Sequence, residues 1–179
     1  MINFFLPIIA LAANASLTFS QPPSNIPVGS TFKISVNVFS AGIPTLGTDA
    51  VITYDNKMLE VVKIDPGNAY PLVPDNLLDI DNVMGKSRFS GTVDLGKPIP
   101  AEGAMGYVYF RAEKEGSTQI NFDWRPGATN DSNIVPNTTE LDLLQQTPQP
   151  IVVNIRQASQ KEKLISTLQW IFSFEYLNF

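Results

Sequence analysis

The chain has 179 residues with 12 Lys and Arg against 17 Asp and Glu, a net charge of −5, and it contains no histidine and no cysteine. This balance offers no basic patch for the phosphates of nucleic acids. The missing residue types exclude a Ser-His-Asp triad, a thiol nucleophile, a thiolate zinc site and a disulfide. The length is sufficient for one domain with a sizeable core.

Residues 1–15 are predicted to form a signal peptide. The stretch Ile2–Ala12 is short and apolar, and Ala13-Asn14-Ala15 fits the small-x-small cleavage pattern, so cleavage would leave Ser16 as the mature N-terminus. Pro7 interrupts a helix, and the stretch is too short to span a membrane. The alternative is a buried first strand or helix, since the α-amino group is the only positive charge before the apolar stretch.

Between residues 16 and 156 the apolar side chains recur with a period of two. The alternation is clear from Phe32 to Val38 and from Ala50 to Tyr54, and it is typical of strands with one buried face. An Asp55-Asn56 turn follows, with a helical turn near Lys57-Met58. These short strands and their Pro- and Gly-rich connectors predict an all-β fold, a two-sheet antiparallel β-sandwich. Further strands are expected over residues 59–64, 88–93, 107–112, 118–122 and 151–155, and a second helical signal over Thr139–Leu144.

The domain is expected to end at residue 156, followed by a linker and a hydrophobic C-terminal tail over residues 157–179. Gln157–Lys163 is polar and charged, whereas Leu164–Phe179 is rich in large apolar residues. Glu175 and Asn178 interrupt the tail, which is shorter than the ~20 residues of a membrane span. Three interpretations remain: a poorly ordered end, an interfacial or cell-wall anchor behind the two lysines of the linker, or a core helix.

Five segments, in this order along the chain, resemble the bacterial cohesin domain family. The resemblance covers about residues 16–156, and the most specific part is Tyr54-Asp55 followed by Leu59-Glu60-Val61-Val62. The five segments are Val28–Val36, Ile52–Val62, Phe89–Gly91, Gly103–Ala112 and Asp131–Val135.

The resemblance implies a jelly-roll sandwich of about nine strands, related to a superfamily of carbohydrate-binding modules. It implies a non-catalytic protein that is exported by a bacterium and acts outside the cell or on its surface. Cohesins hold dockerin modules and so assemble polysaccharide-degrading enzymes, which makes a dockerin-like protein the expected partner.

The resemblance also marks one candidate contact residue. In dockerin-binding members an Asn and an Asp two residues apart on one strand make key contacts. Aligned on Tyr54-Asp55, the Asp falls on Asp49, whereas the Asn position falls on Gly47. Asp49 is expected to point away from the buried face of its strand, so the alternative is an ordinary solvated carboxylate.

A second set of candidates lies on a later strand. Tyr107, Tyr109 and Arg111 alternate with the core residues Val108 and Phe110, so they share the opposite face. Aromatic residues and Arg are enriched at interfaces, and such a platform could bind a protein or stack against a sugar. The alternative is a cross-strand aromatic ladder that only stabilises the sheet. We expect Asp49, Tyr107, Tyr109 and Arg111 to form the exposed binding face.

No cofactor is expected, although a loose calcium site is left open. Asp75, Asp79, Asp81 and Asn82 form an acidic loop, but Val83-Met84 interrupts the pattern of an EF-hand. The same applies to the polar loop Asn130–Asn133. No motif of an enzyme is present, so the leading hypothesis is a protein-interaction module. The alternatives are a carbohydrate-binding module, which would use the same tyrosines, and a structural domain of a surface protein.

Overall fold

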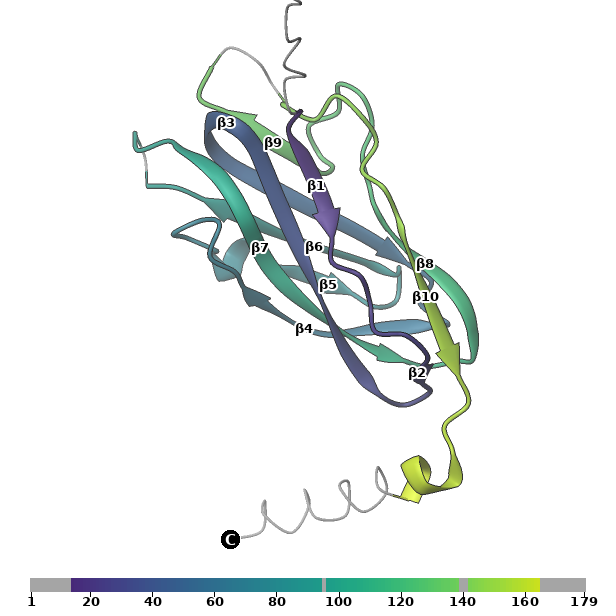
Figure 1. The fold of residues 1–179 in the computed structure, drawn as a ribbon. Coiled ribbons are helices and arrows are strands. Elements are labelled where there is room, and N and C mark those ends of the chain that lie inside the picture. The colour runs from purple at the N-terminus through teal and green to yellow at the C-terminus, as the bar shows by residue number, and fades with distance from the viewer. Residues whose placement is uncertain (1–13, 95, 139–141, 165–179) are drawn as a thin grey trace, which may run out of the picture.

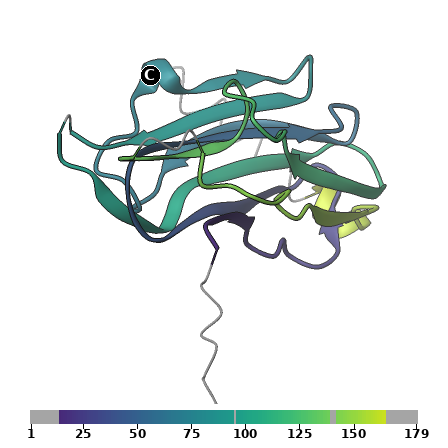
Figure 2. The same ribbon diagram turned by 90° about the horizontal axis from the view of Figure 1, so that it is seen from above.

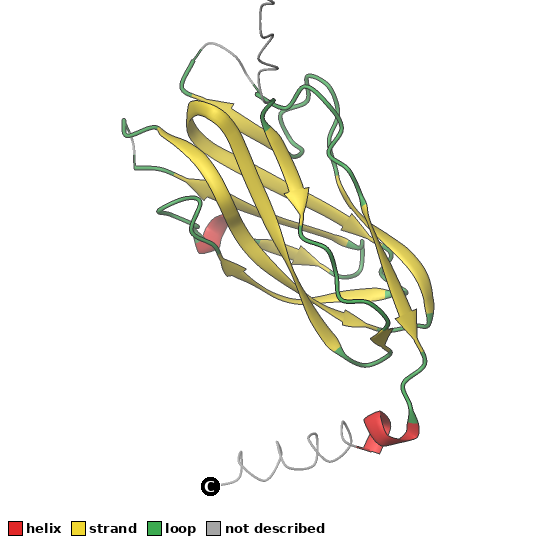
Figure 3. Cartoon of the chain, viewed as in Figure 1, coloured by secondary structure: helices red, strands yellow, loops and turns green. Residues whose placement is uncertain are grey.

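The structure is a computed structural model that describes residues 14–94, 96–138 and 142–164. Almost all regular structure is β-strand, in two packed layers (Figures 1 to 3). The elements are β1 (Ser16–Phe19), β2 (Ile26–Pro27), β3 (Thr31–Tyr54), β4 (Leu59–Pro66), the 3-10 helix η1 (Asp75–Leu77), β5 (Asp79–Asp81), β6 (Lys86–Thr92), β7 (Ile99–Ala112), β8 (Gly116–Phe122), β9 (Asn133–Pro136) and β10 (Ile151–Arg156).

The long strand β3 belongs to both layers. Its first half pairs with β1 and β7, and β7 pairs in turn with β4. Its second half pairs with β6, β8 and β9, and the layer continues to β5 on one side and to β10 and β2 on the other. The strand bends between Phe39 and Pro44, where the register with β7 shifts and Ala41 and Gly42 have positive φ angles of 55° and 78°. A β-bulge of this kind lets one strand turn from one sheet into the other.

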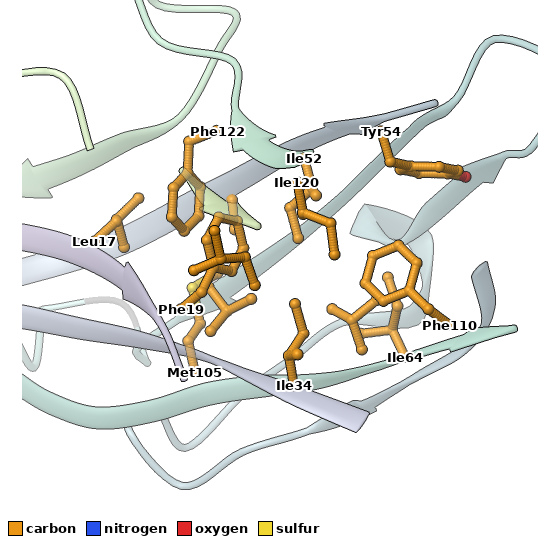
Figure 4. Close-up of a cluster of buried hydrophobic side chains, with 14 of the residues drawn as sticks. Leu17, Phe19, Ile34, Ile52, Tyr54, Ile64, Met105, Phe110, Ile120 and Phe122 are labelled. Carbon is orange, nitrogen blue, oxygen red and sulfur yellow. The ribbon is translucent and has the colours of Figure 1, made fainter. Parts of the chain in front are cut away.

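The core between the layers consists of the alternating side chains that the sequence predicts. Ile34 and Phe110 from one sheet face Ile52 and Ile120 from the other, and all four are inaccessible to solvent (Figure 4). Tyr54 meets the ring of Phe110 edge-on at 5.4 Å between centroids. Burial of these side chains is the main stabilising contribution to the fold, since each large apolar side chain contributes about 1.5–3 kcal/mol.

The predicted β-sandwich is confirmed, with differences in detail. The Asp55-Asn56 turn is present, because the amides of Met58 and Leu59 both donate to the carbonyl of Asp55. The two predicted strands at residues 32–38 and 50–54 are one continuous strand. The short strands β1, β2, β5 and β9 and the helix η1 were not predicted. They bring the described strands to ten rather than about nine, because strands of two to four residues contain too few alternating positions to be recognised.

The predicted domain, residues 16–156, can be compared with the positions of the first and last strands. The first strand begins at Ser16, and the last ends at Arg156. The predicted signal peptide lies outside the described residues except for Asn14 and Ala15. Of the linker and tail, residues 157–164 are described and include one helical turn, and the rest lies outside. Residues 139–141 of the second helical signal lie outside too, and residues 142–144 are not helical. Within the described part of the chain, no helix is long and apolar enough to cross a membrane.

Candidate functional site

The four predicted binding residues do not share a face. Asp49 lies in the second half of β3, opposite Ser90 of β6 and Asn133 of β9. Tyr107, Tyr109 and Arg111 lie on β7 in the other sheet, between β4 and the first half of β3. Because the sheets pack through their inner sides, their outer sides point in opposite directions. The expectation of a single face with all four residues is therefore wrong. The sequence shows which residues point outward but does not show which sheet a strand joins.

Asp49 is the centre of a polar cluster that connects three strands. Its Oδ2 accepts from the Arg88 guanidinium at 2.9 Å and from the Asn133 amide at 3.4 Å, and its Oδ1 accepts from the Ser90 hydroxyl. The Asp49 side chain is only 20% exposed, whereas that of Arg88 is 43% exposed. We call Asp49, Arg88, Ser90 and Asn133 the Asp49 cluster. Both carboxylate oxygens are already engaged, so a partner would meet this cluster mainly through Arg88.

Gly47 occupies the position at which the resemblance expects an Asn. A Cβ atom on Gly47 would lie 2.9 Å from the carbonyl oxygen of Gly91 on the neighbouring strand β6. The register between β3 and β9 also shifts between Thr45 and Gly47. Any side chain at this position would therefore push β3 and β6 apart. The missing Asn is part of the packing of the sheet rather than a simple surface substitution.

A hollow of about 300 Å³ opens over Gly47, and we call it the Gly47 hollow. The Asp49 cluster forms one side of it. Leu46, Leu77 and Val135 supply the apolar wall, and Leu46 and Leu77 are 39% and 38% exposed. Exposed large apolar residues gathered around a depression are a common mark of an interaction site. The alternation of residues 88–93 could have identified Arg88 and Ser90 as outward-facing, but nothing in the sequence indicates that Leu46 and Leu77 line the same hollow.

Three carboxylates border the same face, and we call Asp75, Asp79 and Asp81 the acidic edge. Asp79 and Asp81 lie on β5, in register with Arg88 and Lys86 of β6. These two cations are instead paired with Asp49 and with Asp123. Within the described residues, no ion pair involves a carboxylate of the acidic edge.

The loop that was considered for calcium uses its amide inside the protein. Asn82 Oδ1 accepts from the Tyr54 hydroxyl at 2.7 Å and from the Val61 amide at 2.8 Å, and its Nδ2 donates to the Val61 carbonyl at 2.9 Å. Burial raises the pKa of Tyr54 to about 12, and the charge of Asp81 adds to this shift. Among the residues with described positions, no three acidic side chains are close enough to hold a metal ion.

The polar loop before β9 also has a structural use. The Ser132 hydroxyl accepts from the Val51 amide and donates to the Val51 carbonyl, both at 3.0 Å. Asp131 is fully buried, and its Oδ2 accepts from the Arg125 amide at 2.6 Å. Asp131 Oδ1 and Asn133 Oδ1 are buried and have no hydrogen-bond partner. The loop therefore fixes β9 beside β3 and supports the floor of the Asp49 cluster.

The opposite surface carries Tyr107, Tyr109 and Arg111, and we call these three residues with Lys33 and Lys63 the tyrosine face. The Lys33 ammonium lies 4.8 Å from the ring centre of Tyr107 and 5.9 Å from that of Tyr109, and the Lys63 ammonium lies 4.4 Å from the ring centre of Tyr109. The two tyrosines are half-buried. A sugar that stacked on them would first have to displace an ammonium group, which is held there by cation–π attraction.

The charges of the tyrosine face are balanced by nearby carboxylates. Lys63 pairs with Asp65 at 2.7 Å, and Arg111 pairs with Glu60 and Glu113. The carboxylates next to Arg111 raise its pKa further. This arrangement corresponds to the ladder considered above, in which neighbouring strands stabilise each other. A binding role for Tyr107, Tyr109 and Arg111, as for Asp49, stays a prediction.

Comparison with known proteins agrees with this architecture. The model of the cohesin domain family matches residues 20–142. Among solved structures, the cohesin of the OlpA cohesin–dockerin complex from Clostridium thermocellum superposes with a TM-score of 0.59 at 15% identity, over 80% of this chain and 100% of that chain. A type II cohesin domain from the cellulosome of Acetivibrio cellulolyticus gives 0.60 at 20% identity, over 79% and 96%.

A third similar structure is the cohesin module of a family 33 glycoside hydrolase from Clostridium perfringens, with a TM-score of 0.60 at 12% identity over 81% of this chain and 98% of that chain. No curated protein matches. At these identities the solved structures establish the fold, and the family model, which spans most of the chain, establishes the relationship. Cohesin domains are non-catalytic binding modules, in agreement with the expectation from the sequence. The chain belongs to the cohesin domain family.

Proposed function

We propose that this chain is an exported cohesin that binds a dockerin-type protein through the outer face of β6, β3 and β9, in an extracellular assembly for polysaccharide degradation. Several similar structures are cohesins in complex with dockerins. The observation that carries the proposal is the Gly47 hollow, an exposed apolar depression beside the Asp49 cluster. It lies at the two positions where the family resemblance expects the contact residues.

The chemistry of this face supports the choice. A protein interface typically combines an apolar centre with a polar rim, and its strongest contacts fill pockets. The Gly47 hollow provides the pocket, and the Asp49 cluster and the acidic edge provide the rim. The tyrosine face has no comparable depression among those described. Its aromatic rings are covered by Lys33 and Lys63.

The proposal is tested by titration calorimetry of the chain with a panel of dockerin modules, those of the similar complexes, in calcium-containing buffer. We expect one or more of them to bind, and Arg88→Ala to weaken binding at least about tenfold, because a partly exposed Arg in an interface centre is a frequent hot spot. Arg111→Ala is the matched control, since its side chain is 46% exposed and also paired.

Two results would contradict the proposal. One is a lack of binding to every dockerin of the panel. The other is greater sensitivity to Arg111→Ala than to Arg88→Ala, which would move the interface to the tyrosine face. Retardation of the chain in gels with cellulose, xylan or chitin would favour the carbohydrate-binding alternative instead.

Export is part of the proposal. Residues 1–15 act as the signal peptide and residues 16–156 as the binding domain, a division supported by the start of β1 at Ser16. N-terminal sequencing of the protein from the culture medium should give Ser16 as the first residue. A retained Met1 on secreted protein would contradict the signal peptide.

The tail of the proposed protein begins with a defined turn. Ser159 and Glu162 form a capping box, in which the Ser159 amide donates to Glu162 at 2.8 Å and the Glu162 amide donates to the Ser159 hydroxyl at 3.3 Å. Glu162 also pairs with Arg156 at the end of β10. These contacts lower the pKa of Glu162, with the Arg156 hydrogen bond as the largest cause. We propose residues 157–179 as linker and anchor, which fractionation of the expressing cells with and without these residues would test.

A further inference from the structure

We propose that the Gly47 hollow holds a single apolar side chain of the partner and that basic side chains of the partner flank this anchor and meet the acidic edge. The inference rests on the proposed function, because it describes the chemistry of the partner at the same face. It differs from the contact that the resemblance implies, since the Asn of that contact is absent here.

The apolar half of the inference follows from the walls of the hollow. Leu46 and Leu77 each leave more than a third of their surface exposed, from two segments that are far apart in the sequence. Val135 of β9 completes the wall. An anchor that covers these side chains removes apolar surface from water on both partners.

Gly47 contributes backbone rather than a side chain to the lining of the hollow. The Gly91 carbonyl oxygen, 2.9 Å from the place of a Cβ atom, keeps larger residues out of this position. At this point the lining therefore has no side chain that could fill the hollow. The volume of about 300 Å³ is at the small end of the range for binding pockets, which suits one side chain rather than an extended ligand.

The polar wall of the hollow does not require a polar group on the anchor. Asp49 already accepts from three side chains, and Arg88 is neutralised by Asp49. An apolar anchor leaves these contacts intact and gives up no hydrogen bonds to water when it enters the hollow.

The basic half of the inference follows from charge complementarity. Asp75 shares η1 with Leu77, and Asp79 and Asp81 of β5 lie opposite Arg88 and Lys86 of β6. Within the described part of the chain they have no ion pair. Three uncompensated carboxylates attract a basic surface and repel an acidic one, and they raise the association rate at low salt.

A test that needs no natural partner uses the capped tripeptide arginyl-leucyl-arginine as a probe. Titrated into the full ¹⁵N-labelled chain, it should shift the amide signals of Leu46, Gly47 and Leu77 in a saturable manner. Replacement of the leucine of the probe by alanine should weaken binding roughly tenfold, because most of the apolar contact is lost. Replacement of both arginines by glutamates should weaken it by a similar factor.

Substitutions in the chain provide the second arm of the test. Leu77→Ser should weaken the tripeptide roughly tenfold, and Asp79→Asn should weaken it and reduce its dependence on salt. The matched controls are Val62→Ser, an apolar residue on the edge strand β4 that is 47% exposed, and Glu102→Gln, an exposed carboxylate on β7. Both controls should leave the affinity unchanged, and the spectra themselves report whether each variant is folded.

The inference is overturned if the leucine and alanine probes bind equally, if the largest shifts lie on the tyrosine face, or if no shift occurs at the solubility limit of the probe. Its failure differs from failure of the proposed function. A dockerin that binds through Arg88 but is insensitive to Leu77→Ser and Asp79→Asn contradicts only the inference. A tripeptide that enters the hollow while no dockerin binds contradicts only the proposed function.

Discussion

The two outer surfaces of this sandwich follow the same alternating sequence pattern. They differ in how many of their charged and apolar side chains have a partner on the same surface. On the tyrosine face, each cation lies against an aromatic ring or a carboxylate of the same face. On the outer face of β6, β3 and β9, which we call the Asp49 face, Arg88 and Lys86 pair with Asp49 and Asp123. The acidic edge has no ion pair within the described residues, and leucines border an open hollow.

Exposed Tyr and Arg residues do not by themselves mark a binding face. Tyr107, Tyr109 and Arg111 have the composition of an interface, but their rings and charges already have partners within the domain. Leu46 and Leu77 attract little notice in the sequence, yet both stay partly exposed beside the Gly47 hollow, where a partner would cover them.

The largest expected effect comes from the core that both faces share. Phe89 is fully buried on the inner side of β6, beneath the Asp49 cluster. Phe89→Ala should lower the free energy of unfolding by about 3–5 kcal/mol, because it removes apolar contacts and leaves a cavity. Urea unfolding measures this value. Phe89→Leu is the control, with a loss below about 1.5 kcal/mol. A small effect of the alanine variant would mean that the two faces do not rest on one core.

The second-largest expected effect is the loss of unfolding free energy when the Asp49 cluster loses its central carboxylate. Asp49→Ala should cost about 2 kcal/mol, because it leaves Arg88, Ser90 and Asn133 without their common acceptor. The measurement is again urea unfolding, with the midpoint compared at a constant slope. A cost near zero would show that the Asp49 cluster is a solvated surface group, which is the alternative that the sequence left open.

The matching substitution on the tyrosine face should be milder. Lys33→Met keeps the aliphatic stem and removes the ammonium group that lies over Tyr107 and Tyr109. The expected loss is about 0.5–1 kcal/mol, the range for cation–π contacts at exposed sites. Thermal unfolding of the variant beside the parent chain should show a small decrease of the midpoint. If this variant loses more than the Asp49 variant, the order of the two faces is reversed.

Features that depend on neighbouring residues could be predicted from the sequence, whereas contacts between residues far apart along the chain could not. The alternation that buries Ile34 and Ile52 and turns Asp49 outward is local, and it was predicted correctly. The pairing of Asp49 with Arg88 joins residues 39 positions apart. It depends on the register between β3 and β6, which no local pattern contains.

The same reason explains the incorrect grouping of the four candidates. The bend of β3 between Phe39 and Pro44 moves its second half to the other sheet. Asp49 is therefore separated from Tyr107 and Tyr109, although the first half of the same strand pairs with β7. The hollow likewise depends on Leu77 from a 3-10 helix of three residues, which is too short to leave a periodic signal.

The smallest effect concerns the pH dependence of the tyrosine face. The hydrogen bond from Lys63 holds the pKa of Asp65 below its usual range, and Tyr109 and the charge of Lys33 act in the same direction. Because the folded pKa is the lower one, the ion pair contributes at any pH above the ordinary range of an aspartate. The contribution is lost as the pH falls through the lowered value. Carboxyl ¹³C titration by NMR should show the pKa of Asp65 rising toward its ordinary value in Lys63→Met. An unchanged titration would contradict the ion pair.

The central claim is that the partner meets the Asp49 face and leaves the tyrosine face free. Cross-saturation NMR on the labelled chain bound to an unlabelled dockerin module tests it directly, because signal loss marks the residues in contact. The account predicts the greatest loss at Leu46, Gly47, Leu77 and Arg88, with no loss at Tyr107 or Tyr109. Loss centred on Tyr107, Tyr109 and Arg111, with Leu77 unaffected, would contradict it.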